Sequence, residues 1–141
     1  MSSLDLADEQ MARLLGHAER RSYALGEVLI EEGDEPRAIF FLRSGRVLIE
    51  RDHLGTRVPI DDVGPGEVLG EMSFVAGEPA SATVVAAEPT DADVIPASDL
   101  DALLQEDLIL ASSFYRSLAR TLAVRLRRST DARVGFDYSF G

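Results

Sequence analysis

The feature that most restricts the fold is a series of short β-forming segments between Tyr23 and Ile95. Each segment is rich in β-branched or aromatic residues, and turns marked by glycine, proline or aspartate separate them. The segments read EVLI, AIFFL, RVLIE, RVPI, ATVVA and ADVI. Many short strands with regular turns are typical of an all-β sandwich or barrel and not of a parallel α/β sheet. Between two of them, DHLGT predicts a hairpin in which Gly55 has a positive φ angle.

Helical patterns flank this β region on both sides. From about Leu4 to His17 apolar residues recur at helical spacing and acids come early, which predicts a short amphipathic helix that ends near Gly16. After Pro96, the segment ASDLDALL predicts a helix with Ser98 as its N-cap and acids in its first turn. A longer helix is expected from about Glu106 to Arg128.

This longer helix carries a wide apolar stripe. The residues that recur every four positions along it are Leu110, Phe114, Leu118, Leu122 and Leu126. The stripe has two interpretations, because a buried helix face can belong to a monomer or to a dimer. It packs on the β domain, or part of it pairs with a second protomer, since a small β domain does not obviously cover so broad a face.

The length of 141 residues predicts one domain with a core of its own. We assign residues 1–130 to this domain, with the β region over about 22–96 and the two C-terminal helices over about 98–129. In the last segment, 131–141, apolar residues alternate with small or polar ones, which is strand spacing. Its aromatic side chains predict that the segment docks on its own domain or on a neighbour, because exposed aromatics at a chain end gain nothing.

Composition excludes several classes of function. The formal net charge of −11 argues against general nucleic-acid binding, which requires basic patches. The chain has no cysteine, so disulfides and thiolate sites are excluded.

No apolar run reaches the ~20 residues of a membrane span, and we expect a cytoplasmic protein without a membrane partner. Only residues 129–141 follow the long helix, too few for a helix-turn-helix domain, so no DNA-binding domain is expected.

A set of glycines and the segments between them carry a family resemblance. The segment YALGEVLIEEGDEPRAIFFLRSGRVLIER places Gly26, Gly33 and Gly45 at strand turns, and GPGEVLGEMSFVAGEPASATVVA follows at the expected distance. Together they resemble the cyclic nucleotide-binding domain, the module of catabolite activator proteins, of protein kinase A regulatory subunits and of cyclic-nucleotide-gated channels. The resemblance covers about residues 4–128. It implies a mainly β fold: an eight-stranded double-stranded β-helix (a β-roll or jelly roll) with an N-terminal helix and two C-terminal helices, the last acting as hinge and lid.

In this family a short helix and loop, the phosphate-binding cassette, cradle the cyclic phosphate and the ribose. The resemblance places Gly70 where the backbone approaches the ribose, and Glu71 where a carboxylate accepts hydrogen bonds from the 2′-hydroxyl. Met72 and Ser73 follow as sources of backbone amides for the ligand. Each residue also has a purely structural interpretation, because glycines serve turns and an acid near a helix start is favourable through the helix dipole alone.

The resemblance also predicts the phosphate contacts. Ser81 and Ala82 match the pair whose amides and hydroxyl contact the phosphate, and Thr83 completes the predicted ligand-binding set. One position departs from the family pattern: the family's phosphate-binding arginine falls on Ala80. Loss of a buried Arg–phosphate contact, worth ~1.5–3 kcal/mol, predicts binding that is about tenfold to a few hundredfold weaker. Ser81 has a structural alternative too, a hydrogen bond within its own loop.

A distant arginine is the candidate for restoring the missing charge. We consider Arg116 and Arg120 on the last helix, which the family resemblance also makes a lid, and Arg57 in a β segment. Glu78 in the cassette adds negative charge beside the expected phosphate site. The sequence alone does not choose among the three arginines.

These observations lead to two main functional hypotheses. In the first, the chain is a stand-alone regulatory module that weakly binds cAMP, cGMP or another anionic ligand, signals through its last helix to another protein, and forms a homodimer through that helix. In the second, the β-roll has lost its ligand and serves as an oligomerisation or docking module. A cupin-type metalloenzyme needs a histidine and carboxylate cluster, which two isolated histidines, His17 and His53, do not supply. We therefore expect no enzyme activity, no metal and no cofactor.

Overall fold

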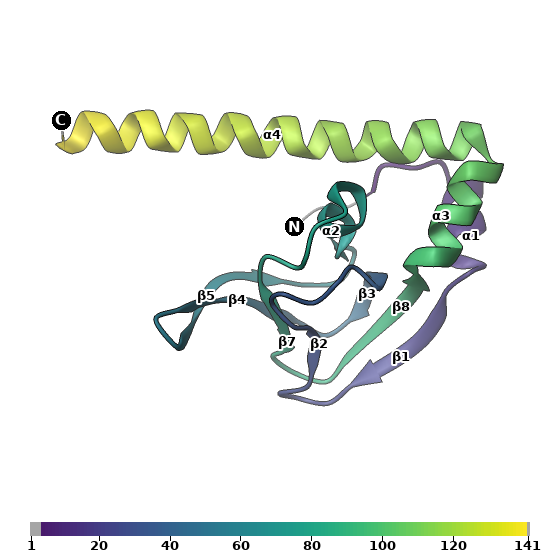
Figure 1. Cartoon of the computed structure of the whole chain (residues 1–141), viewed down its shortest axis with the longest axis horizontal. Helices are drawn as coiled ribbons and strands as arrows, with labels where there is room; N and C mark the ends of the chain where they lie inside the picture. Colours follow the sequence, from purple (N-terminus) through teal and green to yellow (C-terminus); the bar gives the residue numbers. More distant parts are fainter. Residues whose placement is uncertain (1–3, 141) are drawn as a thin grey trace.

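The β strands form two four-stranded antiparallel sheets (Figure 1). The computed structural model describes the backbone of residues 4–140 and the side chains of residues 4–124, 126 and 127. One sheet has the order β1-β8-β3-β6 and the other β2-β7-β4-β5. The strands are β1 (Glu19–Tyr23), β2 (Val28–Ile30), β3 (Ala38–Ser44), β4 (Val47–His53), β5 (Thr56–Val63), β6 (Val68–Leu69), β7 (Thr83–Ala86) and β8 (Thr90–Pro96). The predicted eight-stranded β-roll is confirmed.

Two strands lie outside the six segments that the sequence indicated. β1 reads ERRSY and is exposed at four of its five positions, so it carries no apolar alternation. β6 has only two residues. β1 belongs to the sheet because it pairs along its whole length with β8, from Glu19 opposite Val94 to Tyr23 opposite Thr90. Its pairing partner, and not its own pattern, makes it a strand.

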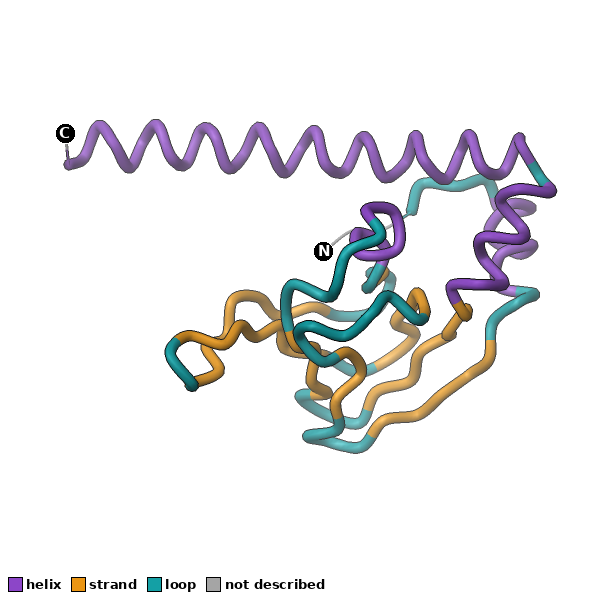
Figure 2. The backbone as a smooth tube through the Cα atoms, in the orientation of Figure 1, coloured by secondary structure: helices purple, strands orange, loops and turns teal. Residues whose placement is uncertain are grey.

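The predicted hairpin joins β4 and β5. His53 pairs with Thr56, so Leu54 and Gly55 form a two-residue loop, and both have positive φ angles, 54° and 86°. Two left-handed residues are what a tight loop between antiparallel strands requires. The hairpin extends away from the rest of the β-roll (Figure 2).

Four helices accompany the sheets: α1 (Asp8–Leu15), α2 (Glu71–Ala76), α3 (Ala97–Glu106) and α4 (Leu108–Phe140). The prediction that Ser98 caps α3 is wrong, because the N-cap is Pro96 and Ser98 lies in the first turn. Strand β8 runs up to Pro96, which pairs with Ala38. The Ala97 N–H then donates to the carbonyl of Arg37, the residue before β3, at 2.8 Å, so the backbone satisfies this helix-start donor.

The core consists of two layers. One cluster lies between the two sheets and includes Val47, Ile49 and Val84. The other lies where α1, α3 and α4 cover the sheet of β3 and β8, and it includes Leu14, Ile95 and Phe114. The helical layer therefore fixes the start of α4 against the β-roll.

The apolar stripe of α4 divides between the two interpretations. Leu110, Phe114 and Leu118 are buried against the domain. Leu122 and Leu126 are 42% and 70% exposed, because α4 continues past the sheets (Figure 1). The first half of the stripe is thus core, and the second half is an exposed apolar surface.

The strand spacing predicted for residues 134–140 is wrong, because α4 continues as a helix through Phe140. An isolated strand would leave its backbone hydrogen-bonding groups without a partner, whereas a helix satisfies its own. The side chains of this segment lie outside the described ones, so its docking stays a prediction. Across the described residues, no helix combines the length and the apolar character needed to cross a bilayer.

Candidate functional site

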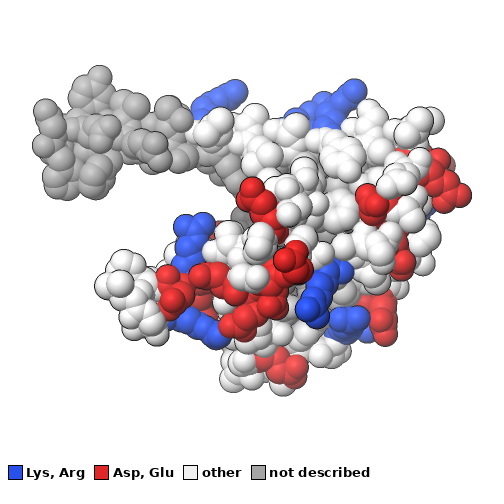
Figure 3. Space-filling view, in the orientation of Figure 1, with Lys and Arg blue, Asp and Glu red and all other residues white. Residues whose placement is uncertain are grey.

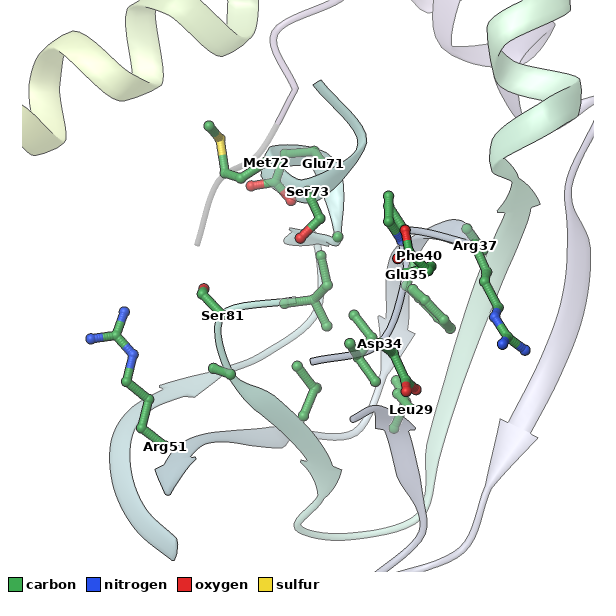
Figure 4. A pocket seen from close by; sticks show the side chains of 17 residues that line it. Leu29, Asp34, Glu35, Arg37, Phe40, Arg51, Glu71, Met72, Ser73 and Ser81 are labelled. Carbon is green, nitrogen blue, oxygen red and sulfur yellow. The ribbon is translucent and has the colours of Figure 1, made fainter. Parts of the chain in front are cut away.

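A cavity of about 280 Å³ opens beside α2 at the edge of the β-roll (Figure 4). Its wall combines β2, the β2–β3 loop, the start of β3, the end of β4, and the segment from β6 through α2 to the start of β7. The residues that line it are Leu29, Ile30, Asp34, Glu35, Pro36, Arg37, Ala38, Phe40, Arg51, Leu69, Gly70, Glu71, Met72, Ser73, Ser81, Ala82 and Val84. Six of the seven predicted ligand-binding residues are therefore in one wall.

Gly70 and Glu71 form the sharp turn between β6 and α2. Gly70 has a φ angle of 85°, and a Cβ at this position would lie 2.8 Å from the Ala38 carbonyl oxygen. Only glycine fits there, since a side chain would meet both a left-handed conformation and a backbone oxygen. The turn brings Glu71 into the cavity wall, where its side chain is only 1% exposed. A buried carboxylate beside a cavity is suited to accept hydrogen bonds from a ligand hydroxyl.

The loop after α2 is held in place by backbone hydrogen bonds. The Ala80 N–H donates to the Asp34 carbonyl and the Gly33 N–H donates to the Ala80 carbonyl, each at 2.8 Å. These bonds pin the loop against the β2–β3 turn and present Ser81 and Ala82 to the cavity. Thr83 is the predicted residue that does not line it. Its buried hydroxyl accepts a hydrogen bond from the Glu32 N–H at 3.0 Å, which ties β7 to the loop that follows β2.

None of the three arginines proposed from the sequence lines the cavity. The Arg57 Nη2 donates to Glu31 Oε1 at 2.8 Å on the protein surface. The Arg120 Nη1 lies 3.7 Å from an Asp5 carboxylate oxygen. Arg116 is exposed on α4. A contact from Arg116 or Arg120 to a ligand stays a prediction and would require α4 to move.

A different arginine, Arg51 near the end of β4, does line the cavity. Strand alternation is the signal that could have found it. Val47 and Ile49 point into the core between the sheets, and Arg51 continues the same face by two residues. Because Arg51 is charged and exposed, it resembles an ordinary surface residue. Only the alternation of side chains along β4 indicates that it faces the same side as Val47 and Ile49.

The cavity wall has mixed charge with a negative excess. It contains the carboxylates of Asp34, Glu35 and Glu71 and the guanidinium groups of Arg37 and Arg51. On the face shown in Figure 3, acidic side chains gather over the β-roll below α2, with arginine side chains between them. A phosphate group that enters this region therefore needs a positive group near it.

A second charge cluster lies away from the cavity. Asp93 on β8 is 8% exposed and contacts Arg20 at 2.7 Å and Arg43 at 3.4 Å. The hydrogen bond from Arg20 to Asp93 raises the pKa of the Arg20 guanidinium above its ordinary value. This cluster joins β1, β8 and β3 and has a structural role.

Aromatic packing connects the cavity to the long helix. The rings of Phe74 on α2 and Phe114 on α4 have centroids 6.3 Å apart and meet edge to face at 87°. The N-terminal segment holds the same part of α4, because the Asp5 N–H donates to Ser117 Oγ at 2.7 Å and Gln10 Nε2 donates to Ser113 Oγ at 2.9 Å. A displacement of α2 would therefore change the packing against α4 directly.

Comparison with known protein families matches residues 20–107 to the cyclic nucleotide-binding domain. The chain belongs to this family. The match includes the glycine turns, the cavity wall and all eight strands except the first residue of β1. The resemblance seen in the sequence is thereby confirmed.

Individual relatives agree with this assignment. The chain is 34% identical over 125 residues to the cyclic AMP receptor protein of Thermus thermophilus, an alignment that spans 88% of this chain and 56% of that protein. The crystal structure of the Thermus thermophilus catabolite activator protein matches with a TM-score of 0.77 and 33% identity, over 94% of this chain and 60% of that one. A cyclic nucleotide-binding domain from Methylobacillus flagellatus matches with a TM-score of 0.80 and 29% identity, over 93% and 74% of the two chains. The chain thus spans somewhat more than half the length of the Thermus relative.

The family is a binding domain, in agreement with the expected lack of catalysis, which itself stays a prediction. Among the described residues, no three or more histidines, aspartates or glutamates are placed together so that they could hold a metal ion.

Proposed function

We propose that this chain is a regulatory module that binds a cyclic nucleotide in the cavity beside α2 and passes the effect of binding to α4. The observation that carries the proposal is the buried Glu71 carboxylate behind Gly70, in the same wall as Ser81 and Ala82. These are the residues that the family's cassette uses, and the cavity brings them together.

The cavity offers a distinct group for each part of the ligand. Glu71 accepts hydrogen bonds from the ribose 2′-hydroxyl, and the Ser81 hydroxyl and the backbone amides of Ser81 and Ala82 donate to the phosphate. Met72 and Ser73 border the same space. Because Ala80 occupies the position of the family's phosphate-binding arginine, we expect the affinity for a cyclic nucleotide to be weaker than that of a cassette with arginine.

The name of the Thermus relative, a cyclic AMP receptor, makes cAMP the first ligand to test and cGMP the second. Titration calorimetry of the wild-type chain with each nucleotide should give a saturable heat at micromolar to millimolar ligand. The Glu71→Gln variant is expected to bind about 10–100-fold more weakly, because it loses a charged hydrogen-bond acceptor for the ribose.

The matched control for this variant is Glu78→Gln. Glu78 lies in the same loop but is exposed and outside the cavity wall, so its loss should leave the affinity unchanged or slightly improved. If neither nucleotide gives heat at millimolar concentration, the ligand-binding proposal fails and the docking module becomes the better description.

The contact between Phe74 and Phe114 supports the signalling part of the proposal. A ligand that draws α2 toward the cavity changes the packing of the partly buried Phe74 on the buried Phe114 of α4, and a closely packed edge-to-face ring pair has few alternative arrangements. The downstream receiver of this movement is proposed to be another protein, in agreement with the net charge of −11, which disfavours nucleic acid.

The exposed side of α4 supports a homodimer. Leu108, Tyr115 and Leu122 are exposed and seven residues apart, and Leu126 follows four residues after Leu122. A repeat of seven residues is that of a two-helix seam, and the step of four to Leu126 is one of the two intervals, four and three, that make up each repeat. A second copy of α4 is the occupant that such a seam fits, since it offers the same residues at the same spacing.

The dimer proposal predicts a change in molecular mass. The double substitution Leu122→Glu and Leu126→Glu should convert a dimer to a monomer in light scattering after size exclusion, because it places charges in the seam. Arg116→Glu is the control, as it changes the net charge by the same −2 on an exposed position of the same helix outside the seam. A monomeric wild type, or a dimer that survives the double substitution, would contradict the proposal.

A further inference from the structure

The cassette provides no positively charged side chain for the phosphate of a ligand in the cavity. A cyclic phosphate carries a negative charge, and the wall contributes three carboxylates. At the position of the cassette arginine stands Ala80, whose backbone is fixed by its hydrogen bonds to Gly33 and Asp34. The positive charge must therefore come from another element.

The strand register places Arg51 beside the phosphate end of the cavity. Strand β4 pairs with β7, and the printed pairs run from Val47 opposite Ala86 to Glu50 opposite Thr83. Continued by one residue, this register sets Arg51 opposite Ala82, one of the two residues expected to contact the phosphate. Neighbouring strands lie about 4.8 Å apart, so the side chain of Arg51 starts one strand away from the cassette loop. In Figure 4 its guanidinium extends along the same side of the cavity as Ser81.

Side chains alternate regularly between the two faces of β4 from Val47 to Arg51. The irregularity between β4 and β5 is a single extra residue in β5, since Ile49 pairs with Asp61 and Glu50 with Pro59. The pairing of β4 with β7 has no such shift. Arg51 therefore stays on the inward-facing side of β4, which it shares with Val47 and Ile49.

The guanidinium of Arg51 is also available to bind a ligand, whereas the neighbouring arginines of the β-roll are paired with carboxylates. Arg20, Arg43, Arg46 and Arg57 each contact a carboxylate within 3.4 Å. Arg51 forms no ion pair with any residue whose side chain the structure describes. Arg37, the other arginine of the wall, points away from the cavity in Figure 4.

The backbone that carries Arg51 is anchored on both sides. The next residue, Asp52, donates its N–H to Glu32 Oε1 at 3.1 Å. On the partner strand, Arg57 is bound to Glu31 at 2.8 Å. These contacts tie the hairpin to the β2–β3 region, so only the Arg51 side chain has to be ordered when a ligand binds.

We infer that Arg51 supplies the positive charge for the ligand's phosphate in place of the arginine that the cassette lacks. The inference rests on the proposed function. Arg51 is then a specificity-determining residue: its guanidinium approaches the phosphate from β4, across the β4–β7 pair, and favours an anionic nucleotide over a neutral nucleoside.

The test is calorimetry with cAMP on five forms of the full chain: wild type, Arg51→Ala, Arg46→Ala, Ala80→Arg, and the double variant Arg51→Ala with Ala80→Arg. Arg51→Ala should bind cAMP roughly 10–100-fold more weakly than the wild type, because it removes a charged donor to the phosphate. Arg46→Ala removes the same charge from the residue just before the same strand, outside the cavity wall, and the affinity should stay within about twofold of the wild type.

The double variant separates charge supply from a structural effect. If Arg51 acts through its charge, an arginine at position 80 should restore at least about tenfold of the affinity that Arg51→Ala loses. Failure of this restoration would overturn the inference, because Arg51 would then act in another way. Thermal unfolding of Arg51→Ala should match that of the wild type, since the side chain is exposed.

The remaining outcomes also decide the question. Wild type and Arg51→Ala with equal affinity overturn the inference and leave the proposed function intact. Binding by Ala80→Arg but not by the wild type shows an intact site in which Arg51 does not replace the missing arginine. No binding by either form removes the proposed function itself, and the inference with it.

Discussion

Replacing Phe114 by alanine should lower the free energy of unfolding by about 3–5 kcal/mol. Phe114 is completely buried at the centre of the helical core and is the largest of the side chains with almost no exposure. Its ring packs on Phe74 of α2, so alanine would remove a large apolar surface and leave a cavity between α2 and α4. Because domains of this size unfold at a total cost of about 5–15 kcal/mol, the change is a large share of the stability.

Urea unfolding followed by circular dichroism measures this change. The control is Ile109→Ala on the same helix, where the side chain is 77% exposed and the loss should be below about 0.5 kcal/mol. A Phe114→Ala variant as stable as the control would show that α4 is not anchored to the β-roll as described. The same variant also removes the ring contact proposed to pass ligand binding to α4.

Replacing Gly45 by alanine should cost about 2–5 kcal/mol, the sum of a conformational term and a steric term. Gly45 turns the chain between β3 and β4 with a φ angle of 87°. A Cβ there would overlap the Pro89 carbonyl oxygen and the Thr90 hydroxyl and lie 2.7 Å from Thr90 Cα. The Thr90 hydroxyl cannot simply move aside, since it donates to the Glu88 carbonyl at 2.8 Å.

Gly55 offers a matched comparison for this prediction. Its φ angle of 86° is nearly the same, but a Cβ at this position would meet nothing within 4 Å. Gly55→Ala should therefore cost only the conformational term, about 1–2 kcal/mol. Chemical unfolding of both variants isolates the steric term at Gly45. Equal losses for the two would mean that the close approach to Thr90 is relieved by a small shift.

The order of the β-roll could be predicted from the sequence because six of its strands carry their own signal. Segments such as AIFFL and ATVVA bury most of their side chains and are followed by turn residues, so local sequence and final structure agree. β1 could not be predicted, since its side chains are mostly exposed and only its pairing with β8 makes it a strand. The C-terminal end of α4 could not be predicted either, because alternating aromatics fit a strand pattern, while a strand also depends on a neighbouring strand with which its backbone can pair.

Part of the candidate site could be predicted from the sequence, and part of it could not. Gly70, Glu71, Ser81 and Ala82 belong to one short stretch of sequence, so a family motif was enough to bring them together. The arginine beside them is far away in the sequence. The sequence suggested three arginines, none of which is in the cavity wall. The wall contains Arg37 and Arg51 instead, and Arg51 lies beside the cassette because β4 pairs with β7.

By itself the sequence determined the type of fold, the cassette and the absence of its arginine, because these depend on residues that are neighbours in the chain. Only the tertiary structure decided that the stripe of α4 is half core and half exposed surface, and that Arg51 shares a cavity with Glu71. The physical reason is that burial and the reach of a charge depend on which elements lie side by side. That arrangement is set by strand register and helix packing across the whole domain, and not by the local pattern of any one segment.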